Sequence, residues 1–304
     1  MTLPHLWVRA EQRDNETRVG LTPDGAAVLL NKGFRITVEQ SSSRVIPAEP
    51  YAEKGCEIAA ENSWPEAPRD AIVFGLKELP DDGTPLVHRH IMFGHAYKGQ
   101  SAGRVLLERF KAGGGTLYDL EYLTDDKGRR VAAFGYWAGF AGAAVAIECW
   151  VAQSRGRHPD PIAPYPDANV LTAALTRKIQ ALDVAMPDAL VVGALGRVGS
   201  GVSDLCQRLG IRVTGWDMAE TIHGGPFPVK VYDRATTWDE PALRVCDNPP
   251  LDVTAIDNLP SILPLESSTD YAAQLLPTLV ELQNTDAAVW ARAKAIFDQH
   301  ILRV

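Results

Sequence analysis

Residues 189–217 read ALVVGALGRVGSGVSDLCQRLGIRVTGWD and contain four features in a fixed order. The apolar run 189–192 is typical of a short buried strand, and a glycine-rich turn, 193–199, follows it at once. A helical pattern then runs to Leu209, and a second strand pattern, 211–216, ends at Asp217. This order is typical of the first half of a dinucleotide-binding fold.

The turn has the glycine spacing GxxGxxG rather than the commoner GxGxxG, so by itself it is a weak signal. Glycines let the backbone approach a pyrophosphate, and a helix N-terminus stabilises its negative charge. Asp217 lies 18 residues beyond Gly199, close to the spacing of an acid that binds ribose hydroxyls and repels a 2′-phosphate. The alternative is a turn that serves only strand–helix packing. We expect NAD, rather than NADP, to contact Gly193, Ala194, Gly196, Arg197, Val198, Gly199 and Asp217.

Strand and helix patterns alternate along the rest of the chain, which predicts an α/β fold with a largely parallel sheet. The expected strands are 6–8, 34–39, 71–76, 91–93 and 116–123, and the expected helices are 24–32, 101–112, 168–182, 267–282 and 287–302. The uncharged stretch Val131–Ile147 is rich in Gly and Ala, so we expect a buried inter-domain helix there and not a membrane span.

Composition excludes several functional classes. A length of 304 residues suggests two domains. The net charge of −8, without a basic run, argues against binding to nucleic acid or to an anionic membrane. The four cysteines are too far apart to form a zinc-binding pair, so no metal is expected. The absence of a signal-peptide pattern predicts a cytoplasmic protein, and the oligomeric state is left open, with a monomer compatible.

Three expected strand ends carry ionisable residues. Glu16 and Arg18 precede a short apolar run, Lys77 and Glu78 follow the strand at 71–76, and His95 and Lys98 follow the strand at 91–93. Singly, these residues are better explained as surface ion pairs, solvated strand ends or a core histidine. Together, and ahead of a nucleotide motif, they favour a dehydrogenase that acts on an anionic substrate.

Segments through nearly the whole chain resemble one family. They are RAEQRDNETRVGLTP (9–23), GLKELP (75–80), LVHRHIMFGHAYKGQ (86–100), GTLYDLEYLTDDKGRRVAAFGYWAGFAGAA (115–144), GALGRVGSG (193–201), GGPF (224–227) and AIDNLPSILPLESS (255–268). They are similar to the saccharopine dehydrogenases that form L-lysine, a branch of the alanine dehydrogenase and transhydrogenase superfamily. Alanine dehydrogenases share the Glu-x-Arg start and the Lys and His positions, but do not resemble the blocks Phe93–Lys98 and Tyr118–Gly142.

The resemblance implies two Rossmann-like domains with the active site in the cleft between them. The substrate domain would comprise residues 1–133 and 265–304, and the NAD-binding domain residues 134–264. The family oxidises saccharopine with NAD⁺ to an imine, which water converts to L-lysine and 2-oxoglutarate. The implied roles cover seven residues: Lys77 as base for the amine, His95 as acid–base residue for water addition, Arg18 and Arg130 as carboxylate ligands, Glu78 and Glu121 as tuning acids, and Lys98 at the substrate. Asp257 is expected near the cofactor, without an assigned role.

The sequence departs from the family after Phe227. The family carries a few dozen further residues between the GGPF segment and the Val-Tyr-Asp segment, which is 231–233 here. Only 39 residues separate Asp217 from Asp257, too few for the several β–α units of a second nucleotide-binding half. Either the 304 residues leave out an internal stretch, or the gene carries a deletion. We expect the first, because a fold without these strands buries too little core.

Two other functions stay open at this stage. An amino-acid dehydrogenase of the alanine type would turn over L-alanine. A non-catalytic nucleotide-binding protein would follow from a true deletion, since the turn at 193–199 is intact.

Overall fold

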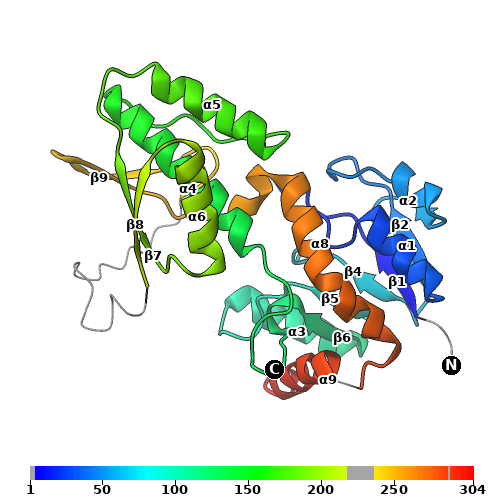
Figure 1. Ribbon diagram of the computed structural model, residues 1–304. Coiled ribbons are helices and arrows are strands. Elements are labelled where there is room, and N and C mark those ends of the chain that lie inside the picture. Colours follow the sequence, from blue (N-terminus) through cyan, green and yellow to red (C-terminus); the bar gives the residue numbers. More distant parts are fainter. Residues whose placement is uncertain (1–3, 218–235, 287) are drawn as a thin grey trace. The chain divides into compact units, whose positions relative to one another are not determined.

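The computed structural model describes residues 4–217, 236–286 and 288–304. The chain forms two compact units (Figure 1). Unit 1 comprises Met1–Ala133 and Ser268–Val304, so it uses both ends of the chain, and unit 2 comprises Phe134–Ser267.

Unit 1 is built on a six-stranded sheet in which every pairing is parallel. The strand order is β3-β2-β1-β4-β5-β6, the order of a doubly wound dinucleotide-binding sheet. The strands are β1 (His5–Val8), β2 (Arg35–Glu39), β3 (Glu57–Ala59), β4 (Ile72–Phe74), β5 (Arg89–Met92) and β6 (Thr116–Asp119). The helices are α1 (Pro23–Asn31), α2 (Glu49–Glu53), α3 (Ser101–Gly113), α8 (Pro264–Val280) and α9 (Ala288–Ile301), with short 3₁₀ turns at Trp64–Glu66, Leu120–Tyr122 and Glu281–Gln283.

The direction of the strand order reverses beside β1. In the chain, β2 and β3 extend the sheet to one side of β1, and β4, β5 and β6 extend it to the other. Connections that leave the carboxyl ends of β1 and β4 therefore run in opposite directions and leave a crevice between them. Residues 9–20 follow β1 and residues 75–80 follow β4, so two of the three predicted ionisable groups begin at this point.

The expected strand at 116–123 is too long. Strand β6 ends at Asp119, because the Asp119 side chain accepts a hydrogen bond from the Glu121 backbone N–H (2.9 Å) and caps the 3₁₀ turn Leu120–Tyr122. Side chains of this type compete with the sheet for backbone donors. The apolar pattern continues past Asp119, so hydrophobicity alone did not indicate the end of the strand.

Unit 2 contains a smaller amount of described sheet. Strand β7 (Asp188–Val192) pairs in parallel with β8 (Arg212–Trp216), and β9 (Leu243–Asp247) forms an antiparallel hairpin with β10 (Pro250–Val253). The helices are α4 (Gly135–Ser154), α5 (Ala168–Gln180) and α6 (Arg197–Arg208), with a 3₁₀ turn at Leu259–Ile262. The expected second strand at 211–216 and the helix before it are therefore confirmed.

Glycines let α4 and α6 approach each other closely. A Cβ atom on Gly139 would overlap the Val198 carbonyl oxygen, and one on Gly201 would overlap the Tyr136 carbonyl oxygen. Residues of α4 such as Phe140 and Val145 are buried in the core of this unit. The Gly/Ala-rich stretch is therefore helical and buried from Gly135 on, although the helix does not begin at Val131 as expected. Among the described residues no helix is long and apolar enough to cross a membrane.

The β7–β8 sheet is largely exposed within the described residues. Val191 is its one buried residue there, while the Val192 side chain is 63% exposed. Parallel sheets are normally covered on both faces. The predicted missing segment would begin after Phe227, which lies outside the described residues.

His90 is a buried polar residue in the core of unit 1. Its side chain is fully buried in β5, with the rings of Trp64 and Phe110 edge-on at 5.2 and 5.4 Å, and neither ring nitrogen has a hydrogen-bond partner. Burial, with the charges of Arg9, His88 and Arg109, lowers the pKa of His90 well below its ordinary value of 6.5. The folded protein therefore holds a neutral imidazole.

Replacement of this ring should flatten the acid limb of the stability curve. The unfolded chain binds a proton at His90 as the pH falls below 6.5, whereas the fold does not, so stability is lost toward acid pH. One such proton changes the free energy of unfolding by on the order of 1 kcal/mol per pH unit. We expect His90→Phe to remove this contribution in urea unfolding measured at several pH values. The exposed His158, changed to Asn, is the control; an unchanged slope in His90→Phe would contradict the assignment.

Candidate active site

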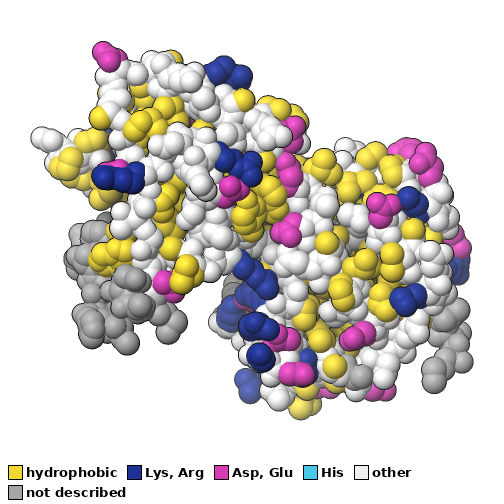
Figure 2. Space-filling model, viewed as in Figure 1, with side chains coloured by type: hydrophobic (Ala, Val, Ile, Leu, Met, Phe, Trp, Pro, Cys, Tyr) yellow, Lys and Arg dark blue, Asp and Glu magenta, His cyan; other side chains and the backbone are white. Residues whose placement is uncertain are grey.

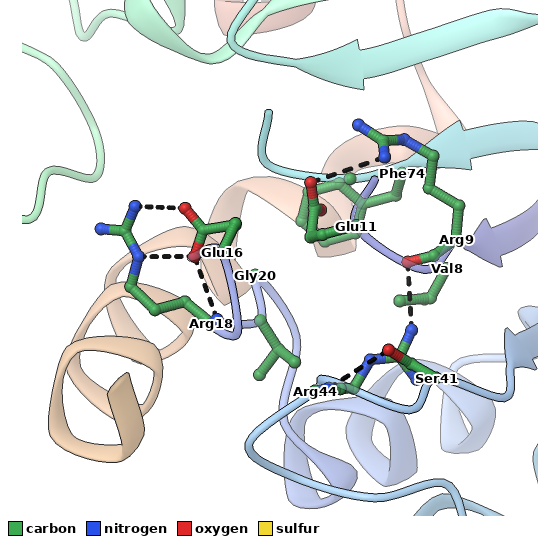
Figure 3. Close-up of a pocket in the computed structure, with 11 residues that line it drawn as sticks. Val8, Arg9, Glu11, Glu16, Arg18, Gly20, Ser41, Arg44 and Phe74 are labelled. Carbon is green, nitrogen blue, oxygen red and sulfur yellow. Dashed lines mark hydrogen bonds and ion pairs between the residues drawn. The ribbon is translucent and has the colours of Figure 1, made fainter. Parts of the chain in front are cut away.

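A pocket lies at the crevice beside β1 and β4 (Figure 3). The residues that line it come from the ends of these strands and the loops that follow them: Val8, Arg9, Glu11, Glu16, Arg18, Val19, Gly20, Ser41, Arg44, Phe74 and Gly75. Arg18 and Glu16 face each other on one side, and Arg9 and Glu11 on the other. The pocket is therefore lined by charged residues of both signs.

Arg18 and Glu16 form a buried bidentate ion pair. Arg18 Nε donates to Glu16 Oε1 at 2.8 Å, and Arg18 Nη2 donates to Glu16 Oε2 at 2.6 Å. Burial would raise the pKa of the Glu16 carboxyl, but its hydrogen bonds to Arg18 and the charges of Arg18 and Lys77 outweigh burial and lower it. The predicted carboxylate ligand Arg18 is therefore already paired with a carboxylate of this chain.

Buried side chains hold the backbone of Lys77 on both sides. The Glu11 carboxylate accepts the backbone N–H groups of Leu76 (2.6 Å) and Lys77 (3.0 Å). The Arg9 guanidinium donates to the Lys77 carbonyl oxygen and pairs with Glu11 at 3.5 Å. Lys77 itself is 7% exposed, and its charge acts on Glu16. The predicted base is thus fixed at the end of β4, next to the Glu16–Arg18 pair.

A second cluster follows β5 and β6. Lys98 Nζ donates to Glu121 Oε1 at 2.8 Å, and Arg130 Nη2 donates to the same oxygen. Burial would raise the pKa of Glu121, but the Lys98 hydrogen bond and the charges of Arg130, Lys98 and His95 lower it below its ordinary value. In the space-filling view, Lys and Arg side chains gather on the surface near α3 (Figure 2). The cluster unites four of the predicted residues.

His95 lies exposed in this cluster, with its ring stacked on that of Phe93 (6.3 Å between centroids, 17° between planes). Its backbone has a φ of +47°, in the left-handed region that non-glycine residues rarely adopt. The buried Asp119 carboxylate contacts the backbone just before His95, because Asp119 Oδ2 accepts the N–H of Gly94 at 3.2 Å. The predicted acid–base residue therefore projects from a constrained turn.

Tyr271 of α8 connects the two clusters. Its side chain is fully buried, and its ring lies 6.2 Å from that of Phe93. Burial raises the pKa of Tyr271, while the charges of Arg18 and Arg130 act in the opposite direction. Both predicted carboxylate ligands are therefore near one hydroxyl group of unit 1.

Glu78 does not share the interaction partners of Lys77. It pairs with Arg13 at 3.2 Å, and both side chains are partly exposed. The structure instead adds Glu11, Asp119 and Tyr271 to the predicted set. Asp119 lies inside the strand expected at 116–123, so no strand-end signal pointed to it. Tyr271 is brought in by the C-terminal segment and had no local signal either.

The glycine-rich turn of unit 2 has the expected local geometry. Gly193 has a φ of +79°, and its N–H donates to the Trp216 carbonyl at 2.7 Å. A Cβ atom on Gly199 would lie 2.6 Å from the Cα of Ala194, so only glycine fits there. Asp217 Oδ2 accepts the N–H of Leu195 at 2.9 Å, which ties the acid at the end of β8 to the turn.

These residues fit the phosphate end of a dinucleotide. Helix α6 begins at Arg197 after the N-cap Gly196, whose position has no side-chain capping bond, and Arg197 and Val198 are exposed. Helix N–H groups are then directed at a surface that an anion can reach. Asp257 is an exposed turn residue next to Asn258, which has a φ of +68°. Among the described residues there is no group of three or more His, Cys, Asp or Glu that could hold a metal ion.

Comparison with known proteins identifies similar sequences over the full length. A family model described as the N-terminal domain of alanine dehydrogenase/PNT matches residues 7–141. Saccharopine dehydrogenase (NAD(+), L-lysine-forming) of Yarrowia lipolytica is 40% identical, with 100% of both chains covered. The protein of the same name from Schizosaccharomyces pombe is 38% identical, again over 100% of both chains.

The alignment with the Yarrowia protein also reveals a difference in length. The alignment spans 369 positions, and this chain has 304 residues, so about 65 positions are gaps in this chain. The two chains therefore match over their full lengths, but the Yarrowia protein has residues that this sequence lacks.

Two solved structures share the fold. An L-alanine dehydrogenase matches with a TM-score of 0.66 at 13% identity, covering 97% of this chain and 99% of that one. A transhydrogenase from Sinorhizobium meliloti matches with a TM-score of 0.54 at 15% identity, covering 91% and 94%.

Gly75 is a sensitive position of this site. A Cβ atom there would lie 2.5 Å from Arg9 Cζ, so Gly75→Ala must displace the guanidinium that holds the Lys77 carbonyl. Overpacking of this kind costs about 1–3 kcal/mol, and we expect that loss in urea unfolding followed by fluorescence. Gly142→Ala, whose Cβ would make an ordinary 3.4 Å contact with Leu259, is the control. Wild-type stability in Gly75→Ala would contradict the tight packing of Arg9.

Proposed function

The chain belongs to the family of NAD⁺-dependent saccharopine dehydrogenases that form L-lysine, and we propose that it oxidises saccharopine to L-lysine and 2-oxoglutarate. The observation that carries this function is the identity of 36–40% to six proteins of that name over 96–100% of their length. The charged strand ends of unit 1 supply residue types suited to that chemistry.

NAD⁺, when bound, supplies the acceptor for the hydride that leaves the substrate carbon. In this proposal the turn Gly193–Gly199 and the N-terminus of α6 bind the pyrophosphate, and Asp217 binds the adenosine ribose. The Asp217 carboxylate would repel a 2′-phosphate, which favours NAD⁺ over NADP⁺. Asp257 is assigned to the cofactor side of the site without a chemical role.

Lys77 is the base in this proposal. A hydride leaves the carbon only when the attached nitrogen is unprotonated and can donate its lone pair, so a proton must first be removed. Lys77 is buried, and Glu11 and Arg9 hydrogen-bond to its backbone, which fixes the point from which its side chain extends. To accept this proton, Lys77 must act as the neutral amine.

The second cluster would bind a substrate carboxylate and direct water. Lys98 and Arg130 share the single carboxylate of Glu121, so this group keeps a net positive charge. Arginine is suited to bidentate carboxylate recognition. Arg18, paired with Glu16, would contribute to the same anion-binding surface, and His95 would move the proton during water addition and collapse of the carbinolamine.

The first experiment is NADH formation from NAD⁺ and saccharopine, with L-alanine and NADP⁺ tested in parallel. The expected result is turnover with saccharopine and NAD⁺ alone. Turnover with L-alanine would assign the alanine-type reaction instead. The intact mass of the same sample, compared with 33.1 kDa, establishes whether the active protein has the 304-residue sequence.

A non-catalytic nucleotide-binding protein is the second candidate. It is favoured by the exposed β7–β8 sheet in the described part of unit 2 and by the alignment positions that this chain leaves empty. Such a protein would bind NAD⁺ and show no turnover with either substrate at a mass of 33.1 kDa.

Lys77→Met tests the assigned base. Removal of a general base typically costs 10²- to 10⁴-fold, and we expect kcat to fall by about that factor. Calorimetric titration should show unchanged NAD⁺ binding, since the nucleotide turn is in unit 2. Lys54→Met is the matched control, because Lys54 is an exposed lysine of unit 1 that pairs with Asp24. Wild-type kcat in Lys77→Met would refute the role.

A further inference from the structure

We propose that Asp119 is a positioning residue of this reaction, which fixes the backbones of both His95 and Glu121 through one buried carboxylate. The proposal rests on the function proposed above, in which His95 transfers a proton and Glu121 holds Lys98 and Arg130.

The carboxylate links two loops that leave neighbouring strands. Asp119 Oδ2 accepts the N–H of Gly94 at 3.2 Å, at the end of β5. Asp119 Oδ1 accepts the N–H of Glu121 at 2.9 Å, at the end of β6. Because the two oxygens belong to one rigid planar group, the turn before His95 and the turn that carries Glu121 cannot move independently while both bonds are formed.

The loop at His95 needs such a support. His95 has a φ of +47°, a conformation that costs a non-glycine residue free energy unless its surroundings impose it. Gly94 is enclosed as well, because a Cβ atom there would lie 2.6 Å from Leu117 Cδ2 and 3.3 Å from Asp119 Oδ2. The bond to Asp119 is made one residue before the strained position, where it can hold the direction in which the imidazole projects.

Asp119 also adds a charge beneath the site. Burial raises the pKa of Asp119 to about 6, while the Glu121 and Gly94 hydrogen bonds and the charge of His95 act to lower it. Protonation in that range would exchange one acceptor oxygen for a hydroxyl donor and break one of the two backbone bonds. The titratable and charged groups whose interactions meet around this carboxylate are His95, Tyr97, Glu121, Tyr122, Tyr271, and, through Glu121 and Tyr271, Lys98, Arg130 and Arg18.

The decisive comparison uses Asp119→Asn, Asp119→Ala and the control Asp82→Asn. Asn keeps one acceptor oxygen and Ala keeps none. Asp82 also accepts a backbone N–H, from Thr84 at 2.9 Å, but in an exposed loop of the same unit. Misplacement of a reacting group by about 1 Å can cost roughly 100-fold in rate. We expect kcat with saccharopine to fall by about that factor in Asp119→Ala and less in Asp119→Asn, with the KM for NAD⁺ unchanged.

The pH profile separates positioning from mere stability. Loss of the carboxylate removes a group whose pKa burial raises to about 6, and whose protonation breaks a backbone hydrogen bond of the site. We therefore expect the acid limb of the kcat profile to move to lower pH in Asp119→Asn, whereas Asp82→Asn should leave that limb where it is. A folded Asp119→Asn with the wild-type kcat and acid limb would overturn the proposal.

Amide hydrogen exchange gives a readout that does not need turnover. We expect a peptide covering residues 93–98 to lose protection in Asp119→Asn, and further in Asp119→Ala where that variant folds, relative to Asp82→Asn. Unchanged protection would overturn the positioning role. If the wild-type protein fails to turn over saccharopine while the exchange difference is present, the proposed function fails and the structural role of Asp119 stands.

Discussion

The crevice beside β1 is the constraint on which the chemistry of unit 1 depends. Strand order reverses there, so the chain leaving β1 and the chain leaving β4 diverge and their first residues line a hollow. Strand order therefore brings Lys77, which follows β4, to the Glu16–Arg18 pair on the loop after β1, about 60 residues earlier in the sequence. A different strand order would separate Lys77 from the Glu16–Arg18 pair.

The carboxylates of Glu11 and Glu16 at this point are paired with arginine and accept backbone hydrogen bonds, which makes their burial tolerable. Unpaired ions of this kind would be costly to bury, and a buried pair is tolerated when its geometry is good and its remaining polar atoms are bonded. The Glu16–Arg18 pair is bidentate, and the Glu11 carboxylate accepts two backbone N–H groups. The hydrogen bonds that allow Arg9 and Glu11 to be buried also hold the backbone of Lys77 in place. The same contacts therefore stabilise the fold and position the predicted base.

Local patterns predicted most strands, the glycine-rich turn and the charged strand ends, because each depends on residues close in sequence. They did not predict the end of β6, since Asp119 stops the strand through a side-chain bond inside an apolar run. Nor did they indicate Tyr271, which reaches the site only because residues 268–304 return to unit 1. The sequence also did not predict that Glu16 pairs with Arg18, because a bidentate ion pair depends on side-chain geometry that residue spacing does not determine.

The described residues of the two units form sheets of different size. Unit 1 has a complete parallel sheet, and the residues assigned to proton transfer and carboxylate binding belong to it. The part of unit 2 that is described has a two-stranded parallel sheet with exposed faces, although its phosphate-binding turn is intact. Loss of residues near the later strands would therefore weaken cofactor binding without disturbing the acid–base groups.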